Sequence, residues 1–147
     1  MSGDPAFSWM TKHGEMAGRI RNIDWSKSPL GEPSEWPQSL KTTINICLSS
    51  KFPMYVWWGS ENINFYNDAY ISIVGSARHP RFLGRPAEEM WSELWPTMNG
   101  WLDEIYASAK SVVKKQNEAT ISFGPAFDDD GEVCGVVAIV LSADMFS

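Results

Sequence analysis

The stretch FPMYVWWGSENINFYNDAY, at residues 52–70, decides the fold. Residues 52–58 and 63–66 are rich in aromatic and β-branched side chains, which favours two short strands. Residues 59–62 between them are polar and begin with glycine, a composition that suits a tight turn. The stretch therefore predicts a β-hairpin.

The end of the same stretch predicts a capped helix. Asn67 and Asp68 both have side chains that accept hydrogen bonds at a helix N-terminus, and Asn67 is the expected structural cap. The helix that follows carries Ala69, Tyr70, Ile73 and Val74. A hairpin that continues into a capped helix forms the mouth of a small concave sheet, which is more typical of a receptor than of an enzyme.

Before this stretch, the sequence predicts an arm and a helical extension. Residues 1–12 have no helical period and are expected to form a flexible arm. Residues 13–50 are expected to form an N-terminal helical extension. Its first helix, within residues 15–25, has apolar side chains at helical spacing, namely Met16, Ile20 and Ile23. These residues either pack against their own domain or form a dimer contact, and the sequence leaves both interpretations open.

Proline positions and apolar periodicity predict three more helices. Pro37 suits the first turn of a helix whose buried stripe is Leu40, Ile44, Cys47 and Leu48. Pro86 is expected to open a helix that Pro96 ends. A longer helix follows, and its apolar stripe consists of Met98, Trp101, Leu102, Ile105 and Ala109.

The last third of the chain is strand-like. Residues 119–127 alternate, and one side of this strand carries Ile121, Phe123 and Phe127. Residues 133–142 form a buried, β-branched strand after a turn at 128–131. Residues 111–115 are either a short third strand, with a tight turn near 116–117, or not a strand. Strands are predicted both before and after the central helices along the chain, and this order predicts an α+β fold with an antiparallel sheet.

Six segments, in order along the chain, resemble a known family. They are residues 23–53, FPMYVWWG (52–59), FYNDAY (65–70), LGRPAEEMW (83–91), ELWP (93–96) and GPAFDDDGEVCGVVAIV (124–140). Together they are similar to the PAS sensor domains at the N-terminus of many bacterial sensor histidine kinases. The resemblance covers residues 20–142, and it is the order of the segments, more than any one of them, that makes it specific.

The resemblance implies both a fold and a role. It implies an antiparallel sheet of about five strands, with helices on one face and extra N-terminal helices, in a single sensory domain at residues 13–147. It implies a signal-transduction module of a bacterial two-component system that modulates a histidine kinase or another output domain. Only residues 110–118 are available between the long helix and the closing hairpin, fewer than the family usually has, so a relative's ligand does not carry over.

Composition narrows the function further. The chain has 147 residues, of which 44% are hydrophobic, and this suits one globular domain. A net charge of −6 and the lack of a basic stripe disfavour a nucleic-acid partner. No apolar run is long enough to cross a bilayer, so no membrane insertion is expected. Cys47 and Cys134 lie in apolar surroundings and are expected to be reduced, as in a cytoplasmic protein.

The sequence offers little catalytic or metal-binding chemistry. His13 and His79 have no partner at ligand spacing, so no metal is expected, haem ligation is disfavoured and His79 is expected to be a solvent-exposed loop residue. Photochemistry through a flavin–cysteine adduct is excluded, because residues 68–74 and 86–95 contain no cysteine. No glycine-rich nucleotide loop occurs, so any kinase activity lies in another domain or partner and these residues are not expected to be an enzyme.

The concentration of aromatic residues is the remaining signal. The ligand-pocket candidates are Tyr55, Trp57, Tyr66, Trp91, Trp95 and Phe123, although core packing is the more common role of such residues. The first strand has two apolar sides, so the sequence does not show which one lines a pocket. The leading hypothesis is a cytoplasmic sensor that binds a small apolar or planar molecule. The alternative is a homodimerisation module with a filled core and no ligand.

Overall fold

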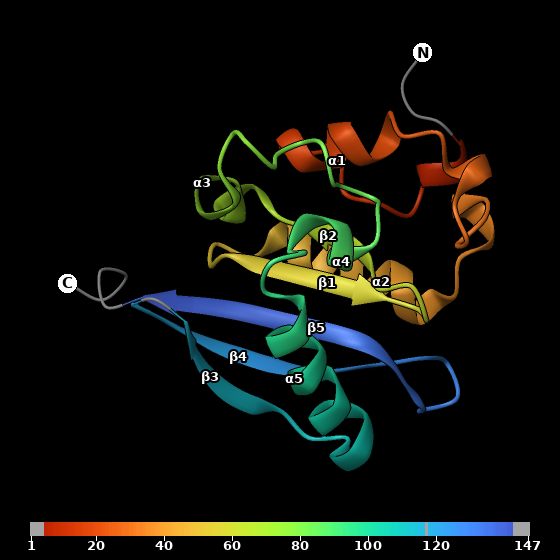
Figure 1. The fold of residues 1–147 in the computed structure, drawn as a ribbon. Helices are drawn as coiled ribbons and strands as arrows, with labels where there is room; N and C mark the ends of the chain where they lie inside the picture. The colour runs from red at the N-terminus through yellow and green to blue at the C-terminus, as the bar shows by residue number, and fades with distance from the viewer. Residues whose placement is uncertain (1–4, 117, 143–147) are drawn as a thin grey trace.

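The segments rich in aromatic and β-branched residues form one sheet. The structure, a computed structural model, describes residues 5–116 and 118–142. Its five strands are antiparallel and lie in the order β2-β1-β5-β4-β3 (Figure 1). The strands are β1 (Met54–Trp58), β2 (Ile63–Tyr66), β3 (Val112–Gln116), β4 (Ala119–Phe127) and β5 (Val133–Ser142). The predicted α+β fold with an antiparallel sheet is confirmed.

Helices lie on both faces of this sheet. The α-helices are α1 (Glu15–Arg21), α2 (Gln38–Ser49), α3 (Ile71–Val74), α4 (Ala87–Met90) and α5 (Trp95–Ser108). The short 3-10 helices are η1 (Pro5–Phe7), η2 (Trp25–Lys27), η3 (Pro33–Glu35) and η4 (Asp68–Tyr70). Figure 1 shows α5 crossing one face of the sheet, while α2 lies behind β1 on the other. Within the described residues, none of the helices combines the length and hydrophobicity needed to span a membrane.

The hairpin expected from residues 52–66 is present. Val56 pairs with Phe65 across β1 and β2, and the amide of Asn62 donates to the Gly59 carbonyl at 3.0 Å. Both of these turn residues have positive φ, 82° at Gly59 and 52° at Asn62. Glycine and asparagine adopt this backbone region more easily than other residues, which explains the composition of the turn.

The third strand, which the sequence left open, exists. β3 pairs with β4 from Val112 opposite Phe123 to Gln116 opposite Ala119. Residue 117, which belongs to the expected turn, lies outside the described residues. The end of β3 lies beside the start of β4, and both strand ends contribute residues to the cavity described below.

The two sides of β1 face different parts of the molecule. Trp57 packs against Trp95 of α5, with ring centroids 5.5 Å apart, so Tyr55 and Trp57 belong to the face covered by α3, α4 and α5, here called the inner face. Val56 belongs to the opposite, outer face together with its partner Phe65, whose ring stacks on Trp25 at 5.5 Å. The N-terminal extension therefore covers the outer face at β1 and β2, which explains why both sides of β1 are apolar.

Residues 5–12 do not form the flexible arm that the sequence predicted. Phe7 and Met10 are buried, and the Phe7 ring meets Trp36 edge-on at 6.1 Å. The amide of Thr11 also donates to the side chain of Asn45 in α2 at 2.9 Å. Residues 1–4 lie outside the described residues. The spacing of these apolar residues is not helical, so periodicity alone could not predict their packing.

The first helix uses its apolar side within its own chain. Met16 and Ile20 are fully buried in the domain core, and Ile23 is half-buried against it. Of the two interpretations that the sequence left open, packing within the domain holds for Met16 and Ile20, which have no exposed surface to offer a second subunit. A dimer contact stays a prediction for Ile23. The helix is also shorter than expected and ends at Arg21.

Two further details differ from the expectations. Pro96 lies in the first turn of α5 rather than ending the helix before it, a position that proline tolerates because the amides of the first turn have no helical partner. Phe127 is exposed although Ile121 and Phe123 on the same strand are buried. The β4–β5 register shifts between Ala126 and Phe127, and this bulge interrupts the alternation.

Asn67 joins three parts of the chain through its side-chain amide, which is almost fully buried. Its Oδ1 accepts hydrogen bonds from the amides of Met54, at 3.1 Å, and Tyr70, at 3.2 Å. Its Nδ2 donates to the carbonyls of Cys47, at 3.0 Å, and Phe52, at 2.8 Å. The side chain therefore caps η4, as the sequence predicted, and also ties the C-terminal end of α2 to the start of β1.

We predict that Asn67→Ala lowers the free energy of unfolding by about 3 kcal/mol or more, because it removes four hydrogen bonds between a buried amide and the backbone. Urea denaturation measures this change. Asn99→Ala, in an exposed position on α5, is the matched control and should stay within about 0.5 kcal/mol of the wild type. A loss below about 1 kcal/mol for Asn67→Ala would contradict the bridging role.

Candidate functional site

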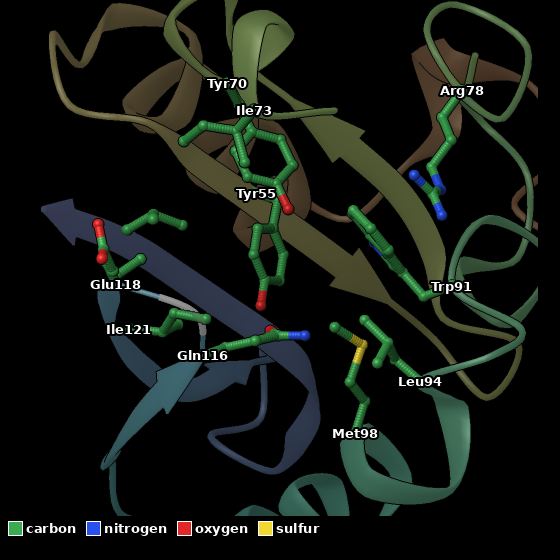
Figure 2. Close-up of a pocket in the computed structure, with 12 residues that line it drawn as sticks. Tyr55, Tyr70, Ile73, Arg78, Trp91, Leu94, Met98, Gln116, Glu118 and Ile121 are labelled. Atoms are coloured by element: carbon green, nitrogen blue, oxygen red, sulfur yellow. The ribbon is translucent and has the colours of Figure 1, made fainter. Parts of the chain in front are cut away.

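A cavity of about 520 Å³ lies on the inner face of the sheet. This volume is within the range of small-molecule sites in proteins, about 300 to 1,000 Å³. Strands β1, β3, β4 and β5, helices α3 and α5, η4 and the loops around α4 and after β3 build its walls (Figure 2). The lining residues are Tyr55, Tyr70, Ile73, Arg78, Trp91, Leu94, Met98, Gln116, Glu118, Ala119, Ile121 and Val140.

Tyr55 and Trp91 are the two sequence-predicted candidates that line this cavity. The others are placed elsewhere. Trp57 is fully buried, and its ring lies 5.5 Å from both Trp95 and Phe123. These three rings fill the inner core beside the cavity, which is the core-packing role that the sequence left as the alternative.

Tyr66, the remaining candidate, connects β2 to the N-terminal extension. Its hydroxyl shares a hydrogen bond with Nδ1 of His79, and Nε2 of His79 lies 3.0 Å from the carboxylate of Glu15 in α1. Burial raises the pKa of Tyr66 to about 12, so the hydroxyl stays neutral. Tyr66 is fully buried, and the three residues link β2, the loop that carries His79 and α1.

His79 is therefore not the solvent-exposed loop residue that the sequence predicted. Its side chain is 8% exposed, and both ring nitrogens have a partner within the chain. The sequence showed only a short polar loop around it, and no local pattern indicated contacts with Glu15 and Tyr66, which lie 64 and 13 residues away. Both nitrogens are engaged, which disfavours haem ligation for a reason that the sequence did not show.

The hydroxyl of Tyr55 is the most unusual polar group in the cavity. The residue is 2% exposed, yet among the described residues its hydroxyl has no hydrogen-bond partner. Burial raises its pKa well above the ordinary value, with a smaller contribution from Tyr70, so the hydroxyl stays protonated. Figure 2 shows it pointing away from β1 into the cavity. A buried hydroxyl without a partner costs folding free energy, and a ligand group that reaches it supplies the missing hydrogen bond.

Arg78 provides a positive charge on the cavity wall. Its guanidinium lies over the Trp91 ring, 4.7 Å from the ring centroid, and its Nε donates to the Met90 carbonyl at 3.1 Å. A further nitrogen of the group lies 4.0 Å from the exposed carboxylate of Glu93, a loose ion pair. The Met90 carbonyl and the Trp91 ring orient the guanidinium, while some of its N–H groups remain available.

The described residues offer little for a metal or a reactive thiol. Among them, no group of three or more histidine, cysteine, aspartate or glutamate side chains is arranged to hold a metal ion. Cys47 and Cys134 are free thiols that do not line the cavity. Burial raises the pKa of each thiol to about 12, with a smaller effect of Asp128 and Asp129 at Cys134. Neither thiol is therefore poised for nucleophilic chemistry.

Several lining residues were not among the sequence candidates. Tyr70 belongs to the capped helix and Met98 to the long apolar stripe, so those two signals could have suggested them. Arg78 lies in a loop, and Gln116 and Glu118 lie where β3 turns into β4. Their positions depend on pairings between distant segments, and no local pattern in the sequence shows them.

Comparison with known proteins supports the fold. Neither the family models nor the curated proteins contain a match. Among solved structures, the C-terminal domain of a Streptococcus mutans protein has a TM-score of 0.55 and 16% identity, covering 73% of this chain and 87% of that one. For a sensory box sensor histidine kinase from Vibrio cholerae the TM-score is 0.51 with 14% identity, covering 71% and 90%. A variant of RsLOV gives 0.52 with 9% identity, covering 72% and 68%. The chain therefore has a PAS-like fold.

We predict that Tyr55→Phe stabilises the ligand-free protein by about 1 kcal/mol, because phenylalanine keeps the ring packing and removes a buried hydroxyl that has no partner among the described residues. Thermal unfolding of the two proteins, each purified free of small molecules, measures the change. Tyr106→Phe, which alters a half-exposed ring on α5, is the control and should have no effect. A less stable Tyr55→Phe variant would show that the hydroxyl has a structural partner.

Proposed function

We propose that this PAS-like domain is a sensor that holds a small, largely planar molecule in the cavity between the sheet and α3 to α5. The observation that carries the proposal is the buried Tyr55 hydroxyl, unpartnered within the described chain, in a cavity of ligand size on the inner face. Aromatic and apolar side chains surround it, which is the usual composition of a small-molecule site. The similarity in fold to a sensory box histidine kinase agrees with a sensory role.

The contacts around η4 indicate how binding could be transmitted. Tyr70 lines the cavity and lies at the end of η4. The neighbouring Asp68 carboxylate accepts hydrogen bonds from the first amides of α1, at Glu15 (3.0 Å) and Met16 (2.8 Å). A ligand that displaces Tyr70 therefore acts on η4, α1 and, through Asn67, the start of β1. Binding shifts the domain between arrangements to the extent that the ligand prefers one of them.

The proposed signal leaves the domain through another module. We propose a cytoplasmic setting and an output such as a histidine kinase, located in another domain or partner, with no catalysis in these residues. Homodimerisation belongs to the same proposal, because sensor modules of this kind commonly act as pairs. In this scheme, ligand binding in the cavity changes the position of elements at the edge of the sheet, and the output domain or partner protein responds to that change.

The test is to identify a bound molecule and then to fill the cavity. Protein purified without heating is analysed by native mass spectrometry, which should reveal a co-purified small molecule. Met98→Trp, which places a larger ring at the cavity wall, should reduce the bound fraction at least tenfold without unfolding the protein. Tyr106→Trp on the same helix lies outside the cavity and should bind normally. An empty wild type that also fails to bind any compound of a broad panel would contradict the proposal.

One observation favours the alternative, a homodimerisation module. Val113 on β3 is 68% exposed and Ile46 on α2 is 60% exposed, so apolar side chains reach the surface. If association is the main role, the apparent mass in size-exclusion chromatography should double as concentration rises, and Val113→Lys should prevent this. A wild type that stays monomeric at all concentrations would reject the alternative.

A further inference from the structure

The cavity wall carries a positive and a negative side chain, and the two differ in how far they are exposed to water. Among the described lining residues, Arg78 is the one cationic side chain and Glu118 the one acidic side chain. Glu118 is exposed, whereas Arg78 is half-buried and fixed against the Trp91 ring. A charge that is partly shielded from water interacts more strongly with a ligand than one that is fully solvated. The cavity is therefore better suited to an anionic group than to a cationic one.

The partners of Arg78 leave it able to bind an anion. Its Nε is engaged with the Met90 carbonyl, which sets the direction of the group. The nearest acid, Glu93, is 83% exposed and only loosely paired at 4.0 Å. An ion pair at this distance with an acid that is exposed to water contributes little, so a ligand carboxylate replaces it at small cost. Arginine also offers paired N–H groups that match the two oxygens of a carboxylate.

The second polar point is the Tyr55 hydroxyl, on a different wall of the cavity from Arg78 (Figure 2). Because it is protonated, it donates one hydrogen bond and can also accept one. The lining also includes the apolar side chains of Leu94 and Met98 and the side-chain amide of Gln116. A thioether and flat aromatic faces make favourable contacts with an aromatic ring. The cavity thus combines a cationic point, an apolar region and a buried hydroxyl.

From this arrangement, and resting on the proposed ligand-binding function, we infer that the cavity takes a planar aromatic carboxylate with two polar ends. The carboxylate binds the Arg78 guanidinium, and an oxygen substituent on the ring bonds to the Tyr55 hydroxyl. A cationic aromatic ligand fits less well, because Arg78 already occupies one face of Trp91 and repels a second cation. A purely apolar ligand leaves the Tyr55 hydroxyl buried and unpaired.

Three matched compounds test the inference by isothermal titration calorimetry on the full chain. They are 6-hydroxy-2-naphthoate, its neutral amide 6-hydroxy-2-naphthamide, and 2-naphthoate, which lacks the hydroxyl. The acid should bind at least about tenfold more tightly than the amide, because a charge-assisted pair is stronger than a neutral hydrogen bond. It should also bind several-fold more tightly than 2-naphthoate, which cannot pair with Tyr55.

Two variants assign each preference to its residue. Arg78→Gln should abolish the preference for the acid over the amide but keep the preference for the ring hydroxyl. Tyr55→Phe should do the reverse. Arg81→Gln is the control, since Arg81 lies in the same loop with its guanidinium over Phe82 and does not line the cavity. It should bind all three compounds like the wild type, and thermal unfolding verifies that each variant is folded.

The outcomes separate this inference from the proposed function. Amide binding as tight as acid binding, or a preference for the acid that persists in Arg78→Gln, overturns the aromatic carboxylate and leaves the sensor proposal intact. Equal binding of 2-naphthoate and its hydroxylated analogue overturns the role of Tyr55. A wild type that binds none of the three compounds overturns the inference, and if it also carries no co-purified molecule the proposed function falls with it.

Discussion

The side-chain amide of Asn67 is the interaction on which the rest of this structure depends. The end of α2, the segment before β1 and the start of η4 meet at this side chain, which forms hydrogen bonds with four backbone groups from these elements. Only a group that both donates and accepts can do this. Aspartate could not donate to the Cys47 and Phe52 carbonyls, and a hydroxyl has too few donors. The elements on either side of the sheet are therefore positioned by one buried residue.

The high aromatic content divides into two layers that serve different purposes. On the outer face, Phe65 stacks on Trp25 and meets Trp36, which attaches the N-terminal extension to the hairpin. On the inner face, Trp57 contacts Trp95 and fills the space under α5. Because Trp57 fills that end, the cavity is confined to the part of the inner face near Tyr70 and the start of β4. Most of the aromatic residues thus pack in the two layers of the core, and few of them line the cavity.

The sequence predicted those parts of the fold that depend on local patterns. The bounds of β4 agree residue for residue, and the cap at Asn67 lies where its residue type and the following apolar stripe indicated. The predictions that were wrong depended on distant contacts. Phe7 packs against Trp36, and no periodicity in the sequence predicts this contact. His79 is buried by its contacts with Glu15 and Tyr66. The same holds for the candidate site. The concentration of aromatic residues predicted Tyr55 and Trp91, whereas no local pattern predicts that a loop arginine lines the cavity.

A domain of this size gains stability from a filled core, so a cavity with a hydroxyl that no described residue pairs with needs a physical reason. Phenylalanine in place of Tyr55 would keep the stacking on Trp57, at 5.1 Å, and avoid the cost of desolvating the hydroxyl. The hydroxyl therefore lowers the stability of the empty protein and raises that of any complex in which it is paired. The free energy recovered on binding then depends on the chemistry of the ligand, and a domain that is incompletely satisfied when empty has more to gain from the right molecule. This difference between the empty and occupied states is what a sensor needs, because only a ligand that distinguishes two states can shift the balance between them.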